Sequence, residues 1–221
     1  MELTNAIRER KSIRGFTKKP VSRETLQEVL TLATRAVSAV NAQPWEFYVV
    51  TGKVLNAIRA DNVECLHNKV PIEMAYSNID GIYHTRRTDI GKRLLTAMGI
   101  AREDRERRDW WLERGFRFFG APVAIILCMD TALDETSYRL DMGCVTQNIC
   151  LSAMEFGLGT CVEYQAVAYE QGLRKYLNIP KNKRLVCGIA IGYPDPDFPA
   201  NHVVSPRENI ENITTWCGFS G

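Results

Sequence analysis

The chain has 221 residues, 45% of them hydrophobic, and its 28 basic residues nearly balance 26 acidic ones, giving a formal net charge of +2. This length and apolar content are sufficient for a sizeable core, so we expect a single domain over residues 1–221. A charge so close to zero gives no long-range positive field of the kind that non-specific nucleic-acid binding uses, and nucleic acid is therefore not an expected partner.

Three features concern the compartment. The opening sequence MELTNAIRER has neither the basic nor the apolar stretch of a signal peptide, and the apolar run APVAIILCM is too short to cross a bilayer. The seven cysteines form an odd number without a C-x-x-C pair, and most lie in apolar runs. We therefore expect a soluble, cytoplasmic protein without a membrane partner, whose cysteines are reduced core residues.

The first quarter of the chain predicts two helices and a strand. Residues 4–11 suit a short helix that is capped by Thr4 and ends near Ser12. Within PVSRETLQEVLTLATRA, Ser22 is in the N-cap position of an amphipathic helix whose apolar residues recur at three-and-four spacing. The β-branched and aromatic run at 45–52 then predicts a strand of buried character.

The second half of the chain predicts two more buried strands, at 120–130 and 184–194. Between them lies a helix of about six turns, which carries apolar residues on almost every face and is therefore expected to be central and buried. Gly157 ends this helix, and the sequence GLGTCV leads from it into an extended segment.

Residues 60–117 have mixed composition, and six arginines face five acidic residues over 102–117. This charge pattern predicts a solvated helix. Trp110 and Trp111 are adjacent and cannot both face the same way, so one of them is available to a ligand or a partner chain. Packing in the core or at a dimer interface is the favoured interpretation of either ring.

Several standard catalytic patterns are absent from the sequence. It contains no phosphate-binding G-x-x-x-x-G-K-[ST] loop, no G-x-S-x-G elbow and no H-E-x-x-H, and its three histidines are far apart. We expect no metal site. The remaining chemical signal is the basic stretch RERKSIRGF at 8–16, in which Arg10, Ser12 and Arg14 alternate and could point to one side of an extended segment as a phosphate clamp. Simple complementation of a helix dipole is the alternative.

These stretches, taken together and in order, resemble the nitroreductase family of FMN-dependent reductases. RERKSIRGF resembles the family's R-[RK]-S-x-R-x-F motif, and ATRAVSAVNAQPWEFYVVTG resembles its A-P-S-x-x-N-x-Q-P-W segment followed by a strand. The later blocks FRFFGAPVAIIL, DMGCVTQNICLSAMEFGLGTCV and GIAIGYPD also fit, as does an arginine in VVSPREN. Five blocks in register make a much stronger case than any one of them.

The resemblance implies an α+β fold, an α-β-α sandwich with a mainly antiparallel sheet, in an intertwined homodimer with two FMN sites built from both chains. Because the flavin carries the hydride chemistry, no catalytic side chain is expected. The residues that the resemblance assigns to FMN are Arg10, Lys11 and Ser12 at the phosphate and ribityl chain, Arg207 completing the phosphate clamp, Arg14 at the pyrimidine edge, Ser38, Ala39, Asn41 and Gln43 from the partner chain, and the backbone of Val162, Glu163 and Tyr164 near the flavin N5. Arg8 is expected to be a surface charge.

The sequence departs from the family pattern at three places. Val37 replaces a proline before the flavin-facing serine, which removes a fixed φ from that loop. Arg114 and Gly115 stand where relatives often place an asparagine near the ring. Ser205 stands where some members carry a second phosphate-binding lysine.

The implied reaction is hydride transfer from NADH or NADPH, through flavin N5, to a small-molecule electron acceptor in a ping-pong cycle. The acceptor is expected to be a nitroaromatic, a quinone or an activated alkene. Tyr83, Trp110 and Trp111 are expected in a lid or insert over 60–117 that selects it. The alternatives are a reductive dehalogenase or flavin-fragmenting branch of the same superfamily, and a non-catalytic flavin-binding protein.

Overall fold

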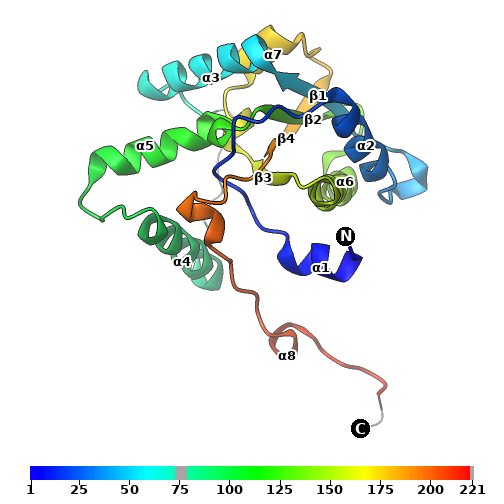
Figure 1. Cartoon of the computed structure of the whole chain (residues 1–221). Helices are drawn as coiled ribbons and strands as arrows, with labels where there is room; N and C mark the ends of the chain where they lie inside the picture. Colours follow the sequence, from blue (N-terminus) through cyan, green and yellow to red (C-terminus); the bar gives the residue numbers. More distant parts are fainter. Residues whose placement is uncertain (73–78, 220–221) are drawn as a thin grey trace.

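The computed structural model describes residues 1–72 and 79–219, which form helices on both faces of an antiparallel sheet (Figure 1). The strand order is β1-β2-β4-β3, and every neighbouring pair is antiparallel. The layers and the antiparallel sheet confirm the predicted fold class. The strands are β1 (Glu46–Thr51), β2 (Val123–Asp130), β3 (Gly159–Glu163) and β4 (Lys183–Gly192).

The helices lie on the two faces and at one end of this sheet. They are α1 (Leu3–Glu9), α2 (Arg23–Ala33), α3 (Gly52–His67), α4 (Gly81–Ala97), α5 (Arg105–Phe116), α6 (Glu135–Glu155), α7 (Glu170–Leu177) and α8 (Ile210–Ile213). Short 3₁₀ turns are η1 (Ala39–Asn41), η2 (Phe118–Gly120), η3 (Gln165–Val167) and η4 (Pro199–His202). Figure 1 shows α2 and α6 against one face of the sheet and α3 and α7 against the other.

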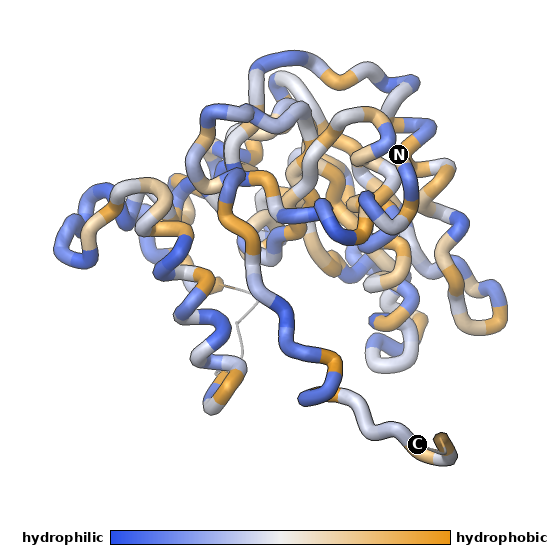
Figure 2. Tube along the Cα trace, turned by 60° about the horizontal axis from the view of Figure 1, so that its bottom comes forward, coloured by the Kyte–Doolittle hydropathy of each residue, from blue (hydrophilic) through white to orange (hydrophobic). Residues whose placement is uncertain are grey.

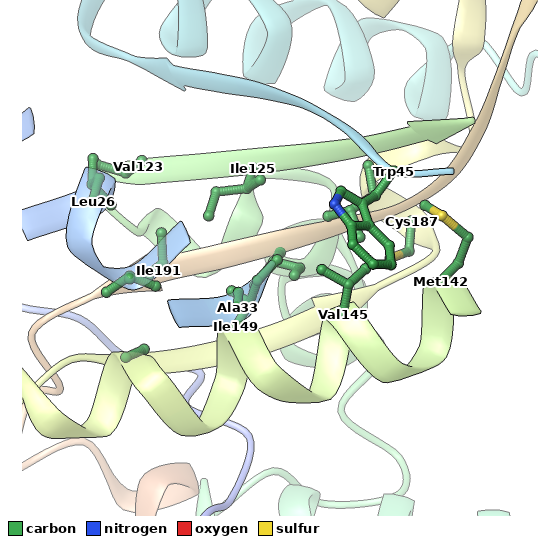
Figure 3. Packing of buried hydrophobic residues seen from close by; sticks show 14 of the residues in the cluster. Leu26, Ala33, Trp45, Val123, Ile125, Met142, Val145, Ile149, Cys187 and Ile191 are labelled. Atoms are coloured by element: carbon green, nitrogen blue, oxygen red, sulfur yellow. The ribbon is translucent and has the colours of Figure 1, made fainter. Parts of the chain in front are cut away.

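The central strand β2 shows why both faces are covered. Its side chains alternate, so Val123, Ile125 and Leu127 enter the core on the α6 side, while Ala124 and Ile126 enter the core on the α3 side. A strand buried on both faces is a continuous apolar run, as the sequence of β2 is. Figure 3 shows the α6-side core, where side chains of β2 and β4 meet those of α2 and α6.

Several predicted elements are confirmed and three details are wrong. Ser22 caps α2 through its hydroxyl, which accepts a hydrogen bond from the N–H of Thr25. Thr4 does not cap α1, because the helix begins at Leu3 and Glu2 occupies the N-cap position. The strand β1 is mostly not buried, since it lies at one edge of the sheet. The helix α6 is also not buried on all its faces as expected, because it buries one face in this chain and leaves residues such as Leu140 exposed.

The expected insert at 60–117 does not begin as a separate unit, because residues 60–67 are the end of α3. Its residues 73–78 lie outside the described residues. The helices α4 and α5 follow, beside the sheet in Figure 1. The C-terminal segment runs away from the body of the chain in both views and exposes apolar side chains on α8 and beyond it (Figures 1 and 2).

Two further observations concern the cysteines and the membrane. Cys128, Cys150, Cys161 and Cys187 are buried without disulfides, as predicted. Within residues 1–72 and 79–219, a helix both long and apolar enough to span a membrane is not found.

Candidate functional site

The basic segment that follows α1 extends the sheet beyond its edge strand β3. Ser12 forms a parallel bridge with Thr160, and the N–H of Ile13 donates to the Thr160 carbonyl at 2.9 Å. The side chain of Ile13 fills the space beside Gly159, where a Cβ atom would lie 2.4 Å from Ile13 Cγ1. The prediction of an extended segment is therefore confirmed, and a glycine at position 159 is what permits the close approach.

The main chain at Arg14 is held by a buried asparagine from η4. Asn201 is only 4% exposed, and its Oδ1 accepts from the N–H groups of Arg14 and Gly15 at 2.7 and 3.1 Å. Its Nδ2 donates to the carbonyls of Gly15 and Asp195 at 2.8 and 2.9 Å. One amide side chain thus joins two segments that are almost the whole chain apart in sequence.

A second contact at the same turn requires a glycine. A Cβ atom on Gly15 would lie 2.1 Å from Cγ of Phe198, so the Phe198 ring packs directly on the Gly15 backbone. On the other side, Arg114 Nη2 donates to the Arg14 carbonyl at 2.6 Å and to the Phe119 carbonyl at 3.1 Å. The Arg14 backbone is therefore held through both its N–H and its C=O.

Arg14 opens onto a hollow of about 280 Å³ beside the end of β3, which we call the β3 hollow. Val162 and Tyr164 are 39% and 48% exposed there, whereas Cys161 and Glu163 on the same strand are buried. The Arg14 guanidinium lies 5.8 Å from the centre of the Phe119 ring. The lining residues are Arg14, Trp111, Leu112, Phe119, Cys161, Val162, Glu163, Tyr164 and Gln165.

Glu163 is the unusual acid of this hollow. It is 5% exposed, and neither carboxyl oxygen has a hydrogen-bond partner within the described part of the chain. Burial raises the pKa of Glu163 well above its ordinary value, and the nearby charges of Arg14 and Arg59 oppose that rise. A neutral Glu163 leaves the Arg14 charge available to an anionic ligand.

Arg10 and Lys11 line a second, larger groove between α1 and the end of α6, of about 570 Å³. This α1–α6 groove also contains Arg8, which is exposed, together with Cys150, Met154 and Thr160. Its volume is in the range typical of small-ligand sites. Arg10 and Arg14 thus line different hollows, with Ser12 between them at the β3 edge, so the three alternating side chains do not converge on one space.

Arg207 lies apart from Arg10 in this chain. It lines a hollow against α4 together with Arg86 and Glu208. Its Nη1 donates to the Ser205 carbonyl and hydroxyl at 2.9 and 2.8 Å, while Arg86 pairs with Glu208 at 2.7 Å. The phosphate clamp of Arg10, Lys11, Ser12 and Arg207 stays a prediction, and in the single chain Arg207 lines a different hollow from Arg10 and Lys11.

The loop that the resemblance assigns to the partner chain has an unusual backbone. Val40, Asn41 and Gln43 have φ values of 47°, 58° and 47°, and Val40 is 93% exposed. A β-branched residue at positive φ is strained, and such strain persists where the surrounding structure fixes it. Here the N–H of Ala39 donates to buried Asp141 on α6 at 3.0 Å, and the N–H of Gln43 donates to the Ser38 hydroxyl at 3.1 Å.

Tyr83, Trp110 and Trp111, which are expected to select the electron acceptor, lie in different places in the structure. Trp111 lines the β3 hollow, with its ring 6.1 Å from that of Phe119. Trp110 is 44% exposed and lies 5.3 Å from the Arg114 guanidinium. Tyr83 is 65% exposed on α4 and is not among the residues described as lining the β3 hollow.

Four residues of this region were not identified from the sequence: Arg59, Phe119, Phe198 and Asn201. Phe119 lies within a quoted block, but its positive φ of 49° and its ring contact with Arg14 have no sequence signal. Phe198 and Asn201 lie in the turn-rich stretch PDPDFPANH, where nothing in the local pattern marks a residue that hydrogen-bonds to the N-terminal segment.

Comparison with known proteins gives a match over most of the chain. The sequence model of the Nitroreductase family matches residues 7–193. The nitrobenzene nitroreductase of Ectopseudomonas oleovorans is 35% identical over 219 residues, covering 97% of this chain and 96% of that protein. The chloronitrobenzene nitroreductase of Comamonas testosteroni is 33% identical over the same shares.

Solved structures agree with this result. The FMN and NADPH-dependent nitroreductase NfnB from Sphigopyxis sp. strain HMH superposes with a TM-score of 0.94 at 30% identity, covering 99% of this chain and 100% of that one. The FMN-dependent nitroreductase NfnB from Mycobacterium smegmatis, solved in complex with NADPH, gives a TM-score of 0.90 at 29% identity over 96% of each chain.

Proposed function

The chain belongs to the nitroreductase family, and on that premise we propose that it is an FMN-dependent oxidoreductase that uses NADPH or NADH to reduce nitroaromatic compounds. The family membership over residues 7–193 supports the class of reaction. Two relatives named for nitrobenzene and chloronitrobenzene support a neutral nitroarene as the acceptor. The solved relatives named for FMN and NADPH support the cofactor and the reductant.

The residues around the β3 hollow fit an isoalloxazine ring. The hollow combines a cation, Arg14, with aromatic side chains and with a strand end whose outward residues Val162 and Tyr164 are exposed. A flat ligand that becomes negative on reduction needs a fixed cation at one edge and an apolar surface at its face. The buried, unpartnered carboxyl of Glu163 does not compete for Arg14 when it is neutral.

When bound, FMN supplies the hydride chemistry at its N5 atom. We place the ring over Val162–Tyr164, with Arg14 at the edge where negative charge develops, because a cation there favours the reduced form. Arg10, Lys11 and Ser12 supply two charges and a hydroxyl on the path away from the hollow, which suits a phosphate and a polyol chain. Arg207 joins them only if the C-terminal segment adopts a different position from that in the single chain.

A homodimer is part of this proposal. The α6 face away from the sheet, the strained loop 38–43 and the apolar tail beyond His202 are exposed in the single chain, with Leu140 at 73% and Val40 at 93%. Exposed apolar side chains in such number are typical of a chain that buries them against a second subunit. A second chain would cover it and would bring Ser38, Ala39, Asn41 and Gln43 to the opposite flavin, and a ping-pong exchange of NAD(P)H and acceptor would then occur at one face.

The observation that carries the proposal is the Arg14 cation fixed beside the exposed end of β3. The test is the absorption spectrum of the purified protein, followed by anaerobic titration with NADPH and NADH and then with nitrobenzene, a quinone and an activated alkene. Flavin absorption, its loss with a nicotinamide and its return with nitrobenzene are expected. A colourless protein that does not bind added FMN would refute the cofactor. Bound flavin that no nicotinamide reduces would indicate a binding protein, and product analysis with halogenated substrates separates the dehalogenase branch.

A further inference from the structure

Arg114 makes more contacts around Arg14 than its position on a charged, solvated helix would suggest. Nη2 alone bridges two carbonyls, those of Arg14 at 2.6 Å and of Phe119 at 3.1 Å. The guanidinium also lies 4.6 Å from the Phe198 ring centre and 5.3 Å from that of Trp110. It therefore joins α5, η2 and the segment before η4 at a single point.

Arg114 contacts the backbone of Arg14, whose positive charge the proposed flavin site uses. The N–H of Arg14 is fixed by Asn201 and its C=O by Arg114, so the peptide planes on both sides of its Cα are held. The Phe198 ring that Arg114 covers is the same ring that packs on Gly15. Rotation of the Arg14 backbone would have to break a charge-assisted hydrogen bond, which is stronger than a neutral one.

The neighbouring residue keeps α5 close enough for this contact. A Cβ atom on Gly115 would lie 2.1 Å from Oε1 of Gln165, which lines the β3 hollow directly after Tyr164. Through these two successive residues, the helix that carries Trp110 and Trp111 contacts three residues that line the hollow, Arg14, Phe119 and Gln165. The Nε–H group of Arg114 is buried and has no hydrogen-bond partner among the described residues, so this donor does not reach solvent.

We propose that Arg114 is a positioning residue for the flavin: by holding the Arg14 carbonyl and stacking on Phe198, it fixes where the Arg14 cation lies beside the β3 hollow. The inference rests on the proposed FMN function and adds the residue that sets the geometry of its charge. Because the interaction of two charges falls with their separation, displacement of Arg14 weakens its preference for the reduced, more negative ring.

The test is a double-mutant cycle on the FMN-loaded protein, with the midpoint potential of bound flavin as the readout and the FMN dissociation constant as the second. Arg114→Gln should lower the preference for reduced over oxidised FMN about tenfold, which is a fall of about 30 mV for a two-electron couple. In an Arg14→Gln background the same substitution should have no further effect, because its action passes through Arg14.

The matched control is Arg107→Gln, which removes the same charge from the same helix. Arg107 also bridges two carbonyls, those of Gly99 and Met98 at 2.7 and 2.8 Å, but neither belongs to the site. The control should keep the wild-type potential. Additive shifts in the cycle would show that Arg114 acts through its own charge and would overturn the inference, as would a wild-type potential in Arg114→Gln.

Folding is monitored by circular dichroism and thermal unfolding. If Arg114→Gln does not fold, Arg114→Lys enters the same cycle, since a single ammonium group keeps the charge but lacks the planar fork that stacks on Phe198. A wild-type potential in that variant would overturn the inference. Absence of FMN from the wild-type protein would refute the proposed function itself, whereas unchanged potentials with FMN bound refute the positioning role alone.

Discussion

Replacement of Asn201 by alanine tests whether the segment around Arg14 is fixed by the fold before any ligand binds. The substitution removes the acceptor of two main-chain N–H groups, those of Arg14 and Gly15, and two donated hydrogen bonds. Each orphaned buried N–H costs about 1–3 kcal/mol, and water can reach the partly buried Arg14. The expected loss in the free energy of unfolding is therefore about 2–4 kcal/mol.

The assay is urea unfolding of FMN-free wild type and variant at equal protein concentration, since subunit association shifts apparent stability. The FMN dissociation constant should also rise, because Arg14 is no longer held in place. Asn201→Asp should be about as harmful, since a carboxylate oxygen would then face the carbonyls of Gly15 and Asp195. Asn182→Ala is the control, because exposed Asn182 makes a side-chain contact at 3.2 Å to Asp130.

The reasoning would be refuted if Asn201→Ala lost less than about 1 kcal/mol, the net value of one ordinary hydrogen bond. It would also fail if the variant and Asn182→Ala bound FMN with the wild-type dissociation constant. Either result would mean that the Arg14 segment is held by its strand pairing with β3 and does not need the η4 amide.

Three further substitutions test other parts of the site. The pKa of Glu163 is raised in the folded chain above its ordinary value of about 4.3. Between these two pKa values the native chain keeps a proton that the unfolded chain loses, so the stability of the protein falls as pH rises. Glu163→Gln should therefore stabilise FMN-free protein at neutral pH, and urea titrations should show that this gain vanishes below about pH 4. Gly15→Ala should lose about 1–3 kcal/mol and weaken FMN binding because Phe198 must move, whereas Gly91→Ala, whose Cβ meets open space on α4, should gain up to about 1 kcal/mol in thermal unfolding. Trp111→Ala should change the ratio of kcat/KM values between nitrobenzene and a quinone; equal ratios would mean that the ring only packs on Phe119.

The parts of the fold that could be predicted from the sequence are those coded by neighbouring residues. The continuous apolar run of β2 and the hydroxyl cap at Ser22 act within a few positions, so their patterns are local. The exposure of β1 and of the outer face of α6 could not be predicted in the same way. An apolar residue on a strand or helix looks the same in sequence whether its own chain or a second subunit covers it.

The candidate site likewise has residues that local sequence patterns predict and residues that they do not. The extended segment at 10–14 and the strand end at 162–164 follow from local patterns and from the family resemblance. Asn201 and Phe198 contribute contacts across about 185 positions, and no periodicity links them to Arg14. The separation of Arg207 from Arg10 also lies beyond the sequence pattern, because the course of the C-terminal segment depends on what it packs against.

The contacts around Arg14 bear on how the basic segment would bind the anion that the proposed function requires. Its main chain is held from two sides, by Asn201 and Arg114. Its guanidinium donates a long hydrogen bond, 3.4 Å, to the Ser12 carbonyl, lies over the Phe119 ring, and forms no ion pair within residues 1–72 and 79–219. The backbone entropy of this residue is therefore lost on folding, before a ligand arrives, and the charge stays available. A cation whose main chain is anchored in this way would favour a ligand that gains negative charge, which is what the proposed function requires of Arg14.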